Sequence, residues 1–397
     1  MMEEALRAPS STARARTATV HLDGATLALV LALLLLGLVM VTSASISIAS
    51  RDTGNPFYFL ERQLLTAVVG TVGAVFVFCF RLERWERLAP VLLGAAIVML
   101  LAVLVPGLGE IVNGGRRWLR LGALNFQVSE LARVLVLIYI ASYAARRQDE
   151  LRETFTGLVK PLLLLGLVGL LLLGEPDFGA ATVLFATGFG MLFIAGARLR
   201  YVIILTTVAA ALFALLAVTS AYRLRRLTGF LDPWANPYSS GFQLTQSLIA
   251  IGRGKWLGVG LGNSVQKLFY LPEAHTDFLF AVLAEELGLL GVLLTLGLFV
   301  ALIWRAFHIA RLASQAGLDF QSYLATGFAL WIGIQAFINV GVNMGVLPTK
   351  GLTLPLMSYG RSSLIVTLVW VGMLLRVHHE TMMERRGSAT VTARGAS

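Results

Sequence analysis

The chain has 397 residues, of which 57% are hydrophobic and only 14% are charged, and its formal net charge is +10. Soluble domains carry about 25% charged residues, so this composition excludes a protein whose whole surface faces water. We expect the bilayer to be its main solvent. The surplus of positive charge then lies in loops. There it is expected to bind anionic lipid headgroups or an anionic substrate, and not nucleic acid.

Apolar stretches long enough to cross a bilayer recur along the chain. A span needs about 20 residues, each rising 1.5 Å. We therefore expect ten transmembrane helices, near 25–46, 63–80, 88–105, 128–145, 158–174, 177–197, 201–220, 277–304, 322–345 and 352–376. The predicted fold class is an all-α integral membrane protein. Its membrane domain covers residues 25–376, between polar tails at 1–24 and 377–397.

The distribution of lysine and arginine predicts the orientation. More than half of these residues fall in the tails and in short loops on the N-terminal side, which places both termini in the cytoplasm. Arg116, Arg117 and Arg120 are exceptions in the outer loop before the fourth span. Further basic residues lie in the large periplasmic loop 221–276, between helices 7 and 8. Binding of an anion would explain them, but a long loop can also be translocated regardless of its charge.

Polar residues in the fourth span, in the turn after the fifth span and in the long loop suggest local roles. Glu130 and Arg133 are three residues apart, so they either pair on one helix face or present Arg133 to an anionic ligand. In the outer turn after the fifth span, Asp177 is expected to cap the sixth. Within the long loop, residues 241–254 predict an interfacial amphipathic helix or a re-entrant segment lining a cavity.

The most polar segment precedes the eighth span and contains Lys267, Glu273, His275 and Asp277. Asp277 could cap the new helix, or act as a general base if an apolar environment raises its pKa. His275 could be a proton relay, a metal ligand or a hydrogen-bonded loop residue. The chain contains no HExxH or CxxC metal-binding spacing.

Charged residues also occur within the eighth span and in the last outer loop. Glu285 lies deeper in the eighth span, where we expect Glu285 or its neighbour Glu286 to pair with a basic residue. The last outer loop, 347–360, is rich in proline and glycine, which predicts an irregular segment at membrane depth. Lys350 and Arg361 bring positive charge to it.

Six motifs occur in an order that resembles the SEDS family (shape, elongation, division and sporulation), and its division branch more than its elongation branch. They are NGGRRWLRLG at 113–122, FQVSELAR at 126–133, EPDFG at 175–179, GLGNSVQK at 260–267, PEAHTDF at 272–278 and NMGVLPTKGLTLPLMSYG at 343–360.

The resemblance implies a ten-helix polymerase of peptidoglycan glycan strands at the division septum of the bacterial cytoplasmic membrane. Its substrate would be lipid II. Its partners would be a class B penicillin-binding protein and other membrane proteins of the division machinery. The family's essential acid falls on Asp277, and its loop arginine on Arg116 or Arg117, with Arg117 preferred. The sequence departs from the family in Arg133, which replaces a lysine, and in Arg361, which replaces a glycine.

The chemistry expected from this resemblance is an inverting glycosyl transfer with Asp277 as the base. The residues expected to neutralise the departing pyrophosphate are Arg116, Arg117, Arg133, Lys267, Lys350 and Arg361. Supporting roles are expected for Glu130, Glu273, His275 and Glu285. A divalent cation could assist, but the sequence shows no dedicated metal site. The alternatives are a lipid II flippase and a membrane scaffold of the division machinery. Motifs clustered at one face favour the enzyme.

Overall fold

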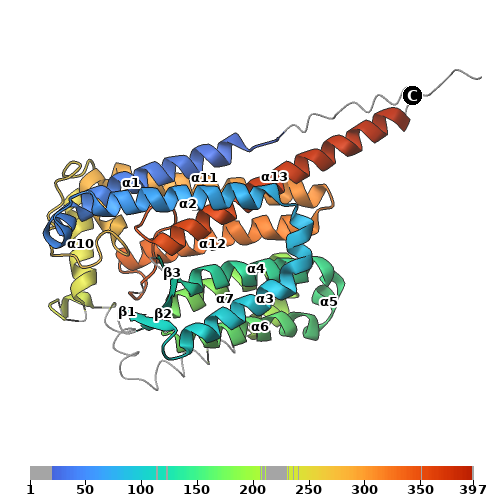
Figure 1. The fold of residues 1–397 in the computed structure, drawn as a ribbon, viewed down its shortest axis with the longest axis horizontal. Helices are drawn as coiled ribbons and strands as arrows, with labels where there is room; N and C mark the ends of the chain where they lie inside the picture. Colours follow the sequence, from blue (N-terminus) through green and yellow to red (C-terminus); the bar gives the residue numbers. More distant parts are fainter. Residues whose placement is uncertain are drawn as a thin grey trace, which may run out of the picture.

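Long helices run side by side in a bundle, with both described ends of the chain at the same end of it (Figure 1). The structure is a computed structural model. It describes residues 20–112, 115–121, 124–205, 207, 211, 230, 232–235, 237–239, 241–349 and 351–395. The helices are α1 (Gly24–Thr53), α2 (Tyr58–Cys79), α3 (Leu82–Leu104), α4 (Val128–Arg146), α5 (Gln148–Glu153), α6 (Phe155–Gly174), α7 (Phe178–Ile194), α10 (Phe242–Gly254), α11 (Leu279–Gln315), α12 (Asp319–Asn343) and α13 (Arg361–Gly395), together with the 3-10 helix η1 (Pro233–Ala235).

Eight of the described helices are long and apolar enough to cross a membrane, and α7 is a shorter apolar helix. These nine match nine of the ten predicted spans, which confirms a multi-pass helical membrane protein. The predicted seventh span, 201–220, lies mostly outside the described residues. The count of ten and the start of the long loop therefore stay predictions.

The outward faces of the bundle are apolar. Val72 of α2, Val91 of α3 and Leu163 of α6 keep 64%, 66% and 68% of their surface exposed. In contrast, most of the apolar stretch of α4 and of α13 is buried inside the protein. Exposed side chains of this kind are unfavourable in water and favourable in lipid, so the outer helices present the surface that the bilayer covers.

A three-stranded antiparallel sheet was not predicted. It contains β1 (Gly109–Val112), β2 (Gly115–Leu121) and β3 (Leu124–Gln127) in that order, with Trp118 opposite Gln127 in the register. The sheet lies at the same end of the bundle as α10 (Figure 1). The arginines of the predicted loop before the fourth span are therefore on β2. A search for long apolar stretches cannot find such short, glycine-flanked strands.

Residues 242–254 form the predicted helix, α10, which packs against α11 and α12 instead of standing alone. Its Ser247 hydroxyl donates a hydrogen bond of 2.8 Å to the carbonyl oxygen of Asn343 at the end of α12. The helix thus closes the same end of the bundle that carries the sheet.

Helix α11 is interrupted at Gly288, whose φ of 63° and ψ of −163° are not helical. A Cβ at this position would lie 2.3 Å from the Gly258 nitrogen, so only glycine fits. The interruption lets the loop after α10 bond to α11. Leu289 N–H donates to the Lys255 carbonyl at 2.9 Å, and Val259 N–H donates to the Glu285 carbonyl at 2.9 Å.

The last helix begins later than predicted. Residues 352–360 were assigned to the tenth span, but α13 begins at Arg361. Pro355 disfavours helical backbone at the residue before it, and Leu356 has a φ of 64°. The irregular segment predicted for this loop therefore extends to residue 360, in agreement with its proline and glycine content.

Candidate active site at the loop end of the bundle

Asp277 lies in the turn that leads into α11 and is half-buried. The N–H groups of Thr276 and Phe278 both donate to the carbonyl oxygen of Glu273, at 3.2 Å each. Helix α11 then begins at Leu279. Its N-cap residue, Phe278, makes no side-chain hydrogen bond, and the Ala281 N–H of the first turn donates to Asn343 Oδ1 of α12 at 3.2 Å. The predicted capping role of Asp277 is therefore wrong, because backbone bonds to Glu273 close the turn and the side chain of Asn343 binds the first turn of the helix.

Side-chain amides of α12 hold the backbone around Asp277. The Asn339 Nδ2 donates to the carbonyl oxygens of Asp277 at 2.9 Å and of Leu352 at 2.6 Å. The Asn343 Nδ2 donates to the Asp277 carbonyl at 3.1 Å. Gln335, Asn339 and Asn343 are all buried and lie four residues apart, so they form one stripe on α12. This stripe was not predicted, although three amides at a spacing of four residues within an apolar stretch are a readable signal.

Gly351 lies next to the Asp277 carboxyl group. A Cβ at Gly351 would lie 3.2 Å from Asp277 Oδ2. Glycine at this position therefore leaves room beside the carboxylate. Lys350, which was predicted to bind the anionic substrate, lies outside the described residues.

The pKa of Asp277 is raised from 3.8 to about 7, chiefly by burial and also by the negative charges of Glu273 and Asp177, against the opposing charge of Arg117. A carboxyl group with this pKa is about half ionised at neutral pH. It is then suited to accept a proton from a reacting hydroxyl group.

Arg117 is brought to Asp277 by the sheet. On β2, its Nε donates to the Glu175 carbonyl at 2.9 Å and its Nη2 to the Pro176 carbonyl at 2.7 Å. The guanidinium is thereby fixed against the turn between α6 and α7, close enough for its charge to act on Asp277. Of the arginines predicted on this loop, Arg117 is the one whose charge acts on the Asp277 carboxyl group.

The other two arginines of β2 have structural partners. The Arg116 Nη1 donates to the carbonyl oxygen of Leu104 at the end of α3, at 3.1 Å. Arg120 lies 3.4 Å from the carboxylate of Glu110 on β1. These contacts tie the sheet together and to α3.

The turn between α6 and α7 adds two acidic groups. Asp177 accepts a hydrogen bond from Ala180 N–H at 3.0 Å, which confirms the predicted cap, and another from the Ser129 hydroxyl at 2.9 Å. Glu175 is completely buried, and its pKa is raised to about 8, chiefly by burial and also by the charge of Asp177, against that of Arg117. No role was predicted for Glu175 from the sequence.

The predicted pairing of Glu130 with Arg133 is present in the structure. The two side chains form an ion pair within α4, and both are buried. The Arg133 Nη1 also donates to Gln335 Oε1 of α12 at 3.3 Å. Arg133 therefore lies inside the bundle, in contact with Gln335 of the amide stripe. Its predicted contact with an anionic substrate stays a prediction.

Lys267 and the two acids of α11 form buried pairs. The Lys267 ammonium lies 2.8 Å from Glu286 Oε1 and 2.9 Å from the Ser43 hydroxyl of α1. Glu285 lies 3.1 Å from the Arg253 guanidinium and accepts a hydrogen bond from Val265 N–H. We expected Glu285 or Glu286 to pair with a basic residue, and both do. These pairs attach the loop between α10 and α11 to α11.

Lys267 also lines an apolar groove of about 450 Å³ between α1, α2 and the loop. Its lining residues are Leu38, Val39, Thr42, Ser43, Ile46, Leu60, Leu261, Gly262 and Lys267. We expected a groove for the lipid tail beside Asp277, but Asp277 does not line this one.

His275 lies in an aromatic cluster. The centroid of its ring is 4.5 Å from that of Phe59 and 5.6 Å from that of Tyr359, and its carbonyl accepts a hydrogen bond from Tyr359 N–H at 2.9 Å. Burial lowers the pKa of His275, so the ring is neutral at pH 7. Arg361, the first residue of α13, lies close enough for its charge to act on Tyr359. In the described part of the chain, no group of three or more His, Cys, Asp or Glu side chains could hold a metal ion.

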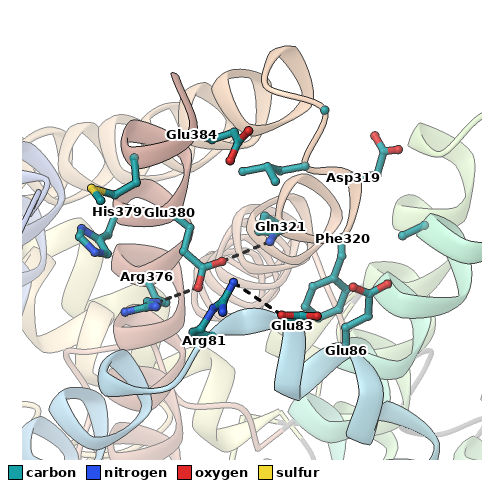
Figure 2. A pocket seen from close by; sticks show the side chains of 14 residues that line it. Arg81, Glu83, Glu86, Asp319, Phe320, Gln321, Arg376, His379, Glu380 and Glu384 are labelled. Atoms are coloured by element: carbon teal, nitrogen blue, oxygen red, sulfur yellow. Dashed lines mark hydrogen bonds and ion pairs between the residues drawn. The ribbon is translucent and has the colours of Figure 1, made fainter. Parts of the chain in front are cut away.

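A second, polar cavity of about 670 Å³ lies at the opposite end of the bundle, where α3 and α12 begin (Figure 2). Glu380 of α13 connects its walls, because it accepts hydrogen bonds from Arg376 Nε at 2.8 Å, Leu82 N–H at 3.0 Å and Gln321 Nε2 at 3.2 Å. This cavity is separated from Asp277 by the length of the helices and is not part of the candidate site.

Comparison with known proteins gives concordant matches. The family of cell cycle proteins that contains FtsW, RodA and SpoVE matches residues 24–383. A probable peptidoglycan glycosyltransferase FtsW of Thioalkalivibrio sulfidiphilus is 59% identical over 354 residues, covering 89% of this chain and 88% of that protein. The corresponding protein of Nitrosococcus halophilus is 57% identical, covering 91% of this chain and 92% of that protein.

Two solved structures share the fold. A chain of a peptidoglycan synthase complex that coordinates polymerization and crosslinking has a TM-score of 0.76 at 33% identity, covering 91% of this chain and 99% of that chain. The rod shape determining protein RodA of Thermus thermophilus has a TM-score of 0.67 at 32% identity, covering 91% of this chain and 98% of that chain.

Proposed function

This chain belongs to the FtsW/RodA/SpoVE family of cell cycle proteins, and from that premise we propose that it is a peptidoglycan glycosyltransferase that polymerises lipid II into glycan strands. The observation that carries the proposal is the Asp277 carboxyl group. It is half-buried at one end of the bundle, its pKa is raised to about 7, and the guanidinium of Arg117 lies nearby.

The reaction is an inverting displacement. Asp277 takes the proton from the 4-hydroxyl of the GlcNAc of one lipid II molecule. That oxygen attacks the anomeric carbon of the MurNAc at the reducing end of the growing strand and forms the new glycosidic bond. The bond from this carbon to the pyrophosphate breaks, and undecaprenyl pyrophosphate leaves with the electron pair. A single base is sufficient for inversion, whereas retention would need a carboxylate nucleophile as well.

The leaving group needs positive charge more than it needs an acid, because a pyrophosphate is stable as an anion once its charge is neutralised. Arginine suits this role through bidentate contacts with phosphate oxygens. Arg117 is the leading candidate because its guanidinium is fixed on the turn between α6 and α7 and its charge acts on Asp277, and Arg361 is the second. Arg133 and Lys267 already pair with buried glutamates, which limits their availability for a substrate.

The orientation follows from the charge distribution. The end of the bundle with Asp277 faces the periplasm, and both termini lie in the cytoplasm, so lipid II keeps its tail in the bilayer while its sugars reach the site. The site is expected to work at the division septum with a class B penicillin-binding protein. One solved relative that supports such a partner comes from a peptidoglycan synthase complex.

The test is polymerisation of lipid II by the purified full-length protein, together with its transpeptidase partner, with glycan strands resolved on a gel. Asp277→Ala and Asp277→Asn should abolish strand formation while the protein still purifies as a folded complex. The matched control is Asp52→Asn, an exposed carboxylate beside Arg51 near the same end of the bundle, and it should retain activity.

Undiminished polymerisation by either Asp277 variant would overturn the proposal. A wild-type protein that moves lipid II across proteoliposomes without forming strands would indicate the flippase. Complex formation without either activity would indicate the scaffold.

A further inference from the structure

Glu175 is a buried carboxyl group that the reaction described above does not use. It follows the last residue of α6, and its side chain has no exposed surface. Within the described residues, neither of its carboxyl oxygens has a hydrogen-bond partner. An ionised carboxylate in this position would have an unfavourable free energy, since it would lie in an apolar environment without a donor.

The arrangement of Arg117 indicates which form is present. Its Nε and Nη2 donate to the backbone carbonyl oxygens of Glu175 and Pro176. The guanidinium therefore binds the backbone of Glu175 and not its carboxyl group. A charged carboxylate beside an arginine normally takes a charge-assisted hydrogen bond, which is about twice as strong as a bond to a neutral acceptor. A protonated Glu175 explains why the carbonyls are bound instead.

The surrounding charges agree with this geometry. Asp177, two residues along the same turn, carries a negative charge that disfavours ionisation of Glu175, and Arg117 of β2 is the positive charge that favours it. Burial outweighs the attraction to Arg117 and raises the pKa of Glu175 to about 8. Both Arg117 and Asp177 also act on Asp277, so these side chains share one electrostatic environment.

We propose that Glu175 is a positioning residue that carries its proton in the working protein, so that the guanidinium of Arg117 keeps its full positive charge for the pyrophosphate of the substrate. This inference rests on the proposed function for the identity of the anion, but the protonation of Glu175 can be tested without it. When the pH rises, Glu175 releases its proton to solvent, and its carboxylate then pairs with Arg117 and neutralises the anion-binding charge.

The protonation state is measured by infrared difference spectroscopy of the full-length protein during a pH titration. The wild type minus Glu175→Gln difference should contain the carbonyl band of a protonated carboxyl group at pH 7, and this band should disappear with a midpoint near pH 8. An absent band at pH 7 would overturn the inference whether or not the protein polymerises lipid II. If Glu175→Gln does not fold, Glu175→Met, which is neutral and of similar volume, replaces it.

The functional consequence is measured as polymerisation rate against pH. With the acid limb set by Asp277 and the alkaline limb by Glu175, the wild-type rate should fall about sixfold between pH 7.5 and pH 9. Glu175→Gln should retain the rate at pH 7.5 and lose this fall, because its amide cannot ionise. The matched control Glu110→Gln, on β1 beside Arg120, should keep the wild-type profile.

The outcomes separate the two proposals. A titrating band together with an alkaline limb that Glu175→Gln leaves unchanged would overturn the role assigned to Glu175 in preserving the charge of Arg117. A titrating band in a protein that forms no glycan strands would leave Glu175 protonated and would overturn the proposed function alone.

Discussion

Polymerisation should depend steeply on pH below neutrality, because only the ionised form of Asp277 can accept a proton. Its pKa of about 7 is far above the ordinary value of 3.8. With this pKa, about 3% of Asp277 is ionised at pH 5.5 and about half at pH 7, so the rate should rise about fifteenfold over this interval. With an ordinary pKa, the rate over the same interval would be nearly constant.

The cause of the raised pKa can be tested in the same assay. Glu273 is an exposed residue whose negative charge raises the pKa of Asp277, so Glu273→Gln should move the acid limb to lower pH and increase the relative rate at pH 5.5. Glu61→Gln removes an acid from the first turn of α2 and is the matched control, with no shift expected.

The assay is the initial rate of strand formation at saturating lipid II, in buffers of constant ionic strength, with the folded fraction measured at each pH. A profile that is flat from pH 5.5 to pH 7 would refute the reasoning. An acid limb that Glu61→Gln shifts as much as Glu273→Gln does would refute the assignment of its cause.

Three further predictions concern the framework of the site, each measured as the free energy of unfolding of the purified protein in detergent. Asn339→Leu should cost about 1–3 kcal/mol and lower activity, because the Leu352 carbonyl loses the Asn339 donor and the Asp277 carbonyl keeps only that of Asn343; unchanged stability would contradict this. Arg133→Met should cost about 3–5 kcal/mol by leaving Glu130 buried without its partner, whereas adding Glu130→Leu should recover most of that loss; equal losses would contradict the pairing. Lys267→Met should destabilise by a similar amount while the folded fraction keeps its polymerisation rate; a selective loss of activity would instead make Lys267 a substrate ligand.

The bundle was predictable because its signal is local. A transmembrane helix must satisfy its own backbone hydrogen bonds in lipid, so each span appears as a long apolar stretch. The sheet was not predictable in the same way. Its strands are short, and β2 mixes three arginines with apolar residues without a regular alternation, so neither length nor hydropathy distinguishes it from a loop.

Part of the site was visible in the sequence and part was not. Asp277 and Arg117 were identified from motifs, and the structure brings them together from segments 160 residues apart. The capping role of Asp277 could not be excluded from spacing alone, because the backbone bonds that close its turn depend on the left-handed conformation of Glu273. The burial of Glu175 is likewise a property of the packed turn and leaves no local pattern.

Buried charges show the same limit. A basic residue near an outer helix end suits an anionic substrate, and the sequence analysis assigned Lys267 to one. In the structure its ammonium pairs with Glu286, which is 19 residues away in the sequence, and with Ser43 of α1. Only the fold reveals such a partner, because the pair joins a loop to two helices.

The most direct test of the account is to separate binding from chemistry in Asp277→Asn. This substitution keeps the size of the side chain and its contacts but removes the base. Equilibrium binding of fluorescent lipid II to the purified variant should stay within about twofold of wild type, while the maximal polymerisation rate falls by at least about 100-fold. A maximal rate within a few fold of wild type, or a loss that weaker binding explains in full, would contradict the assignment of Asp277 as the base.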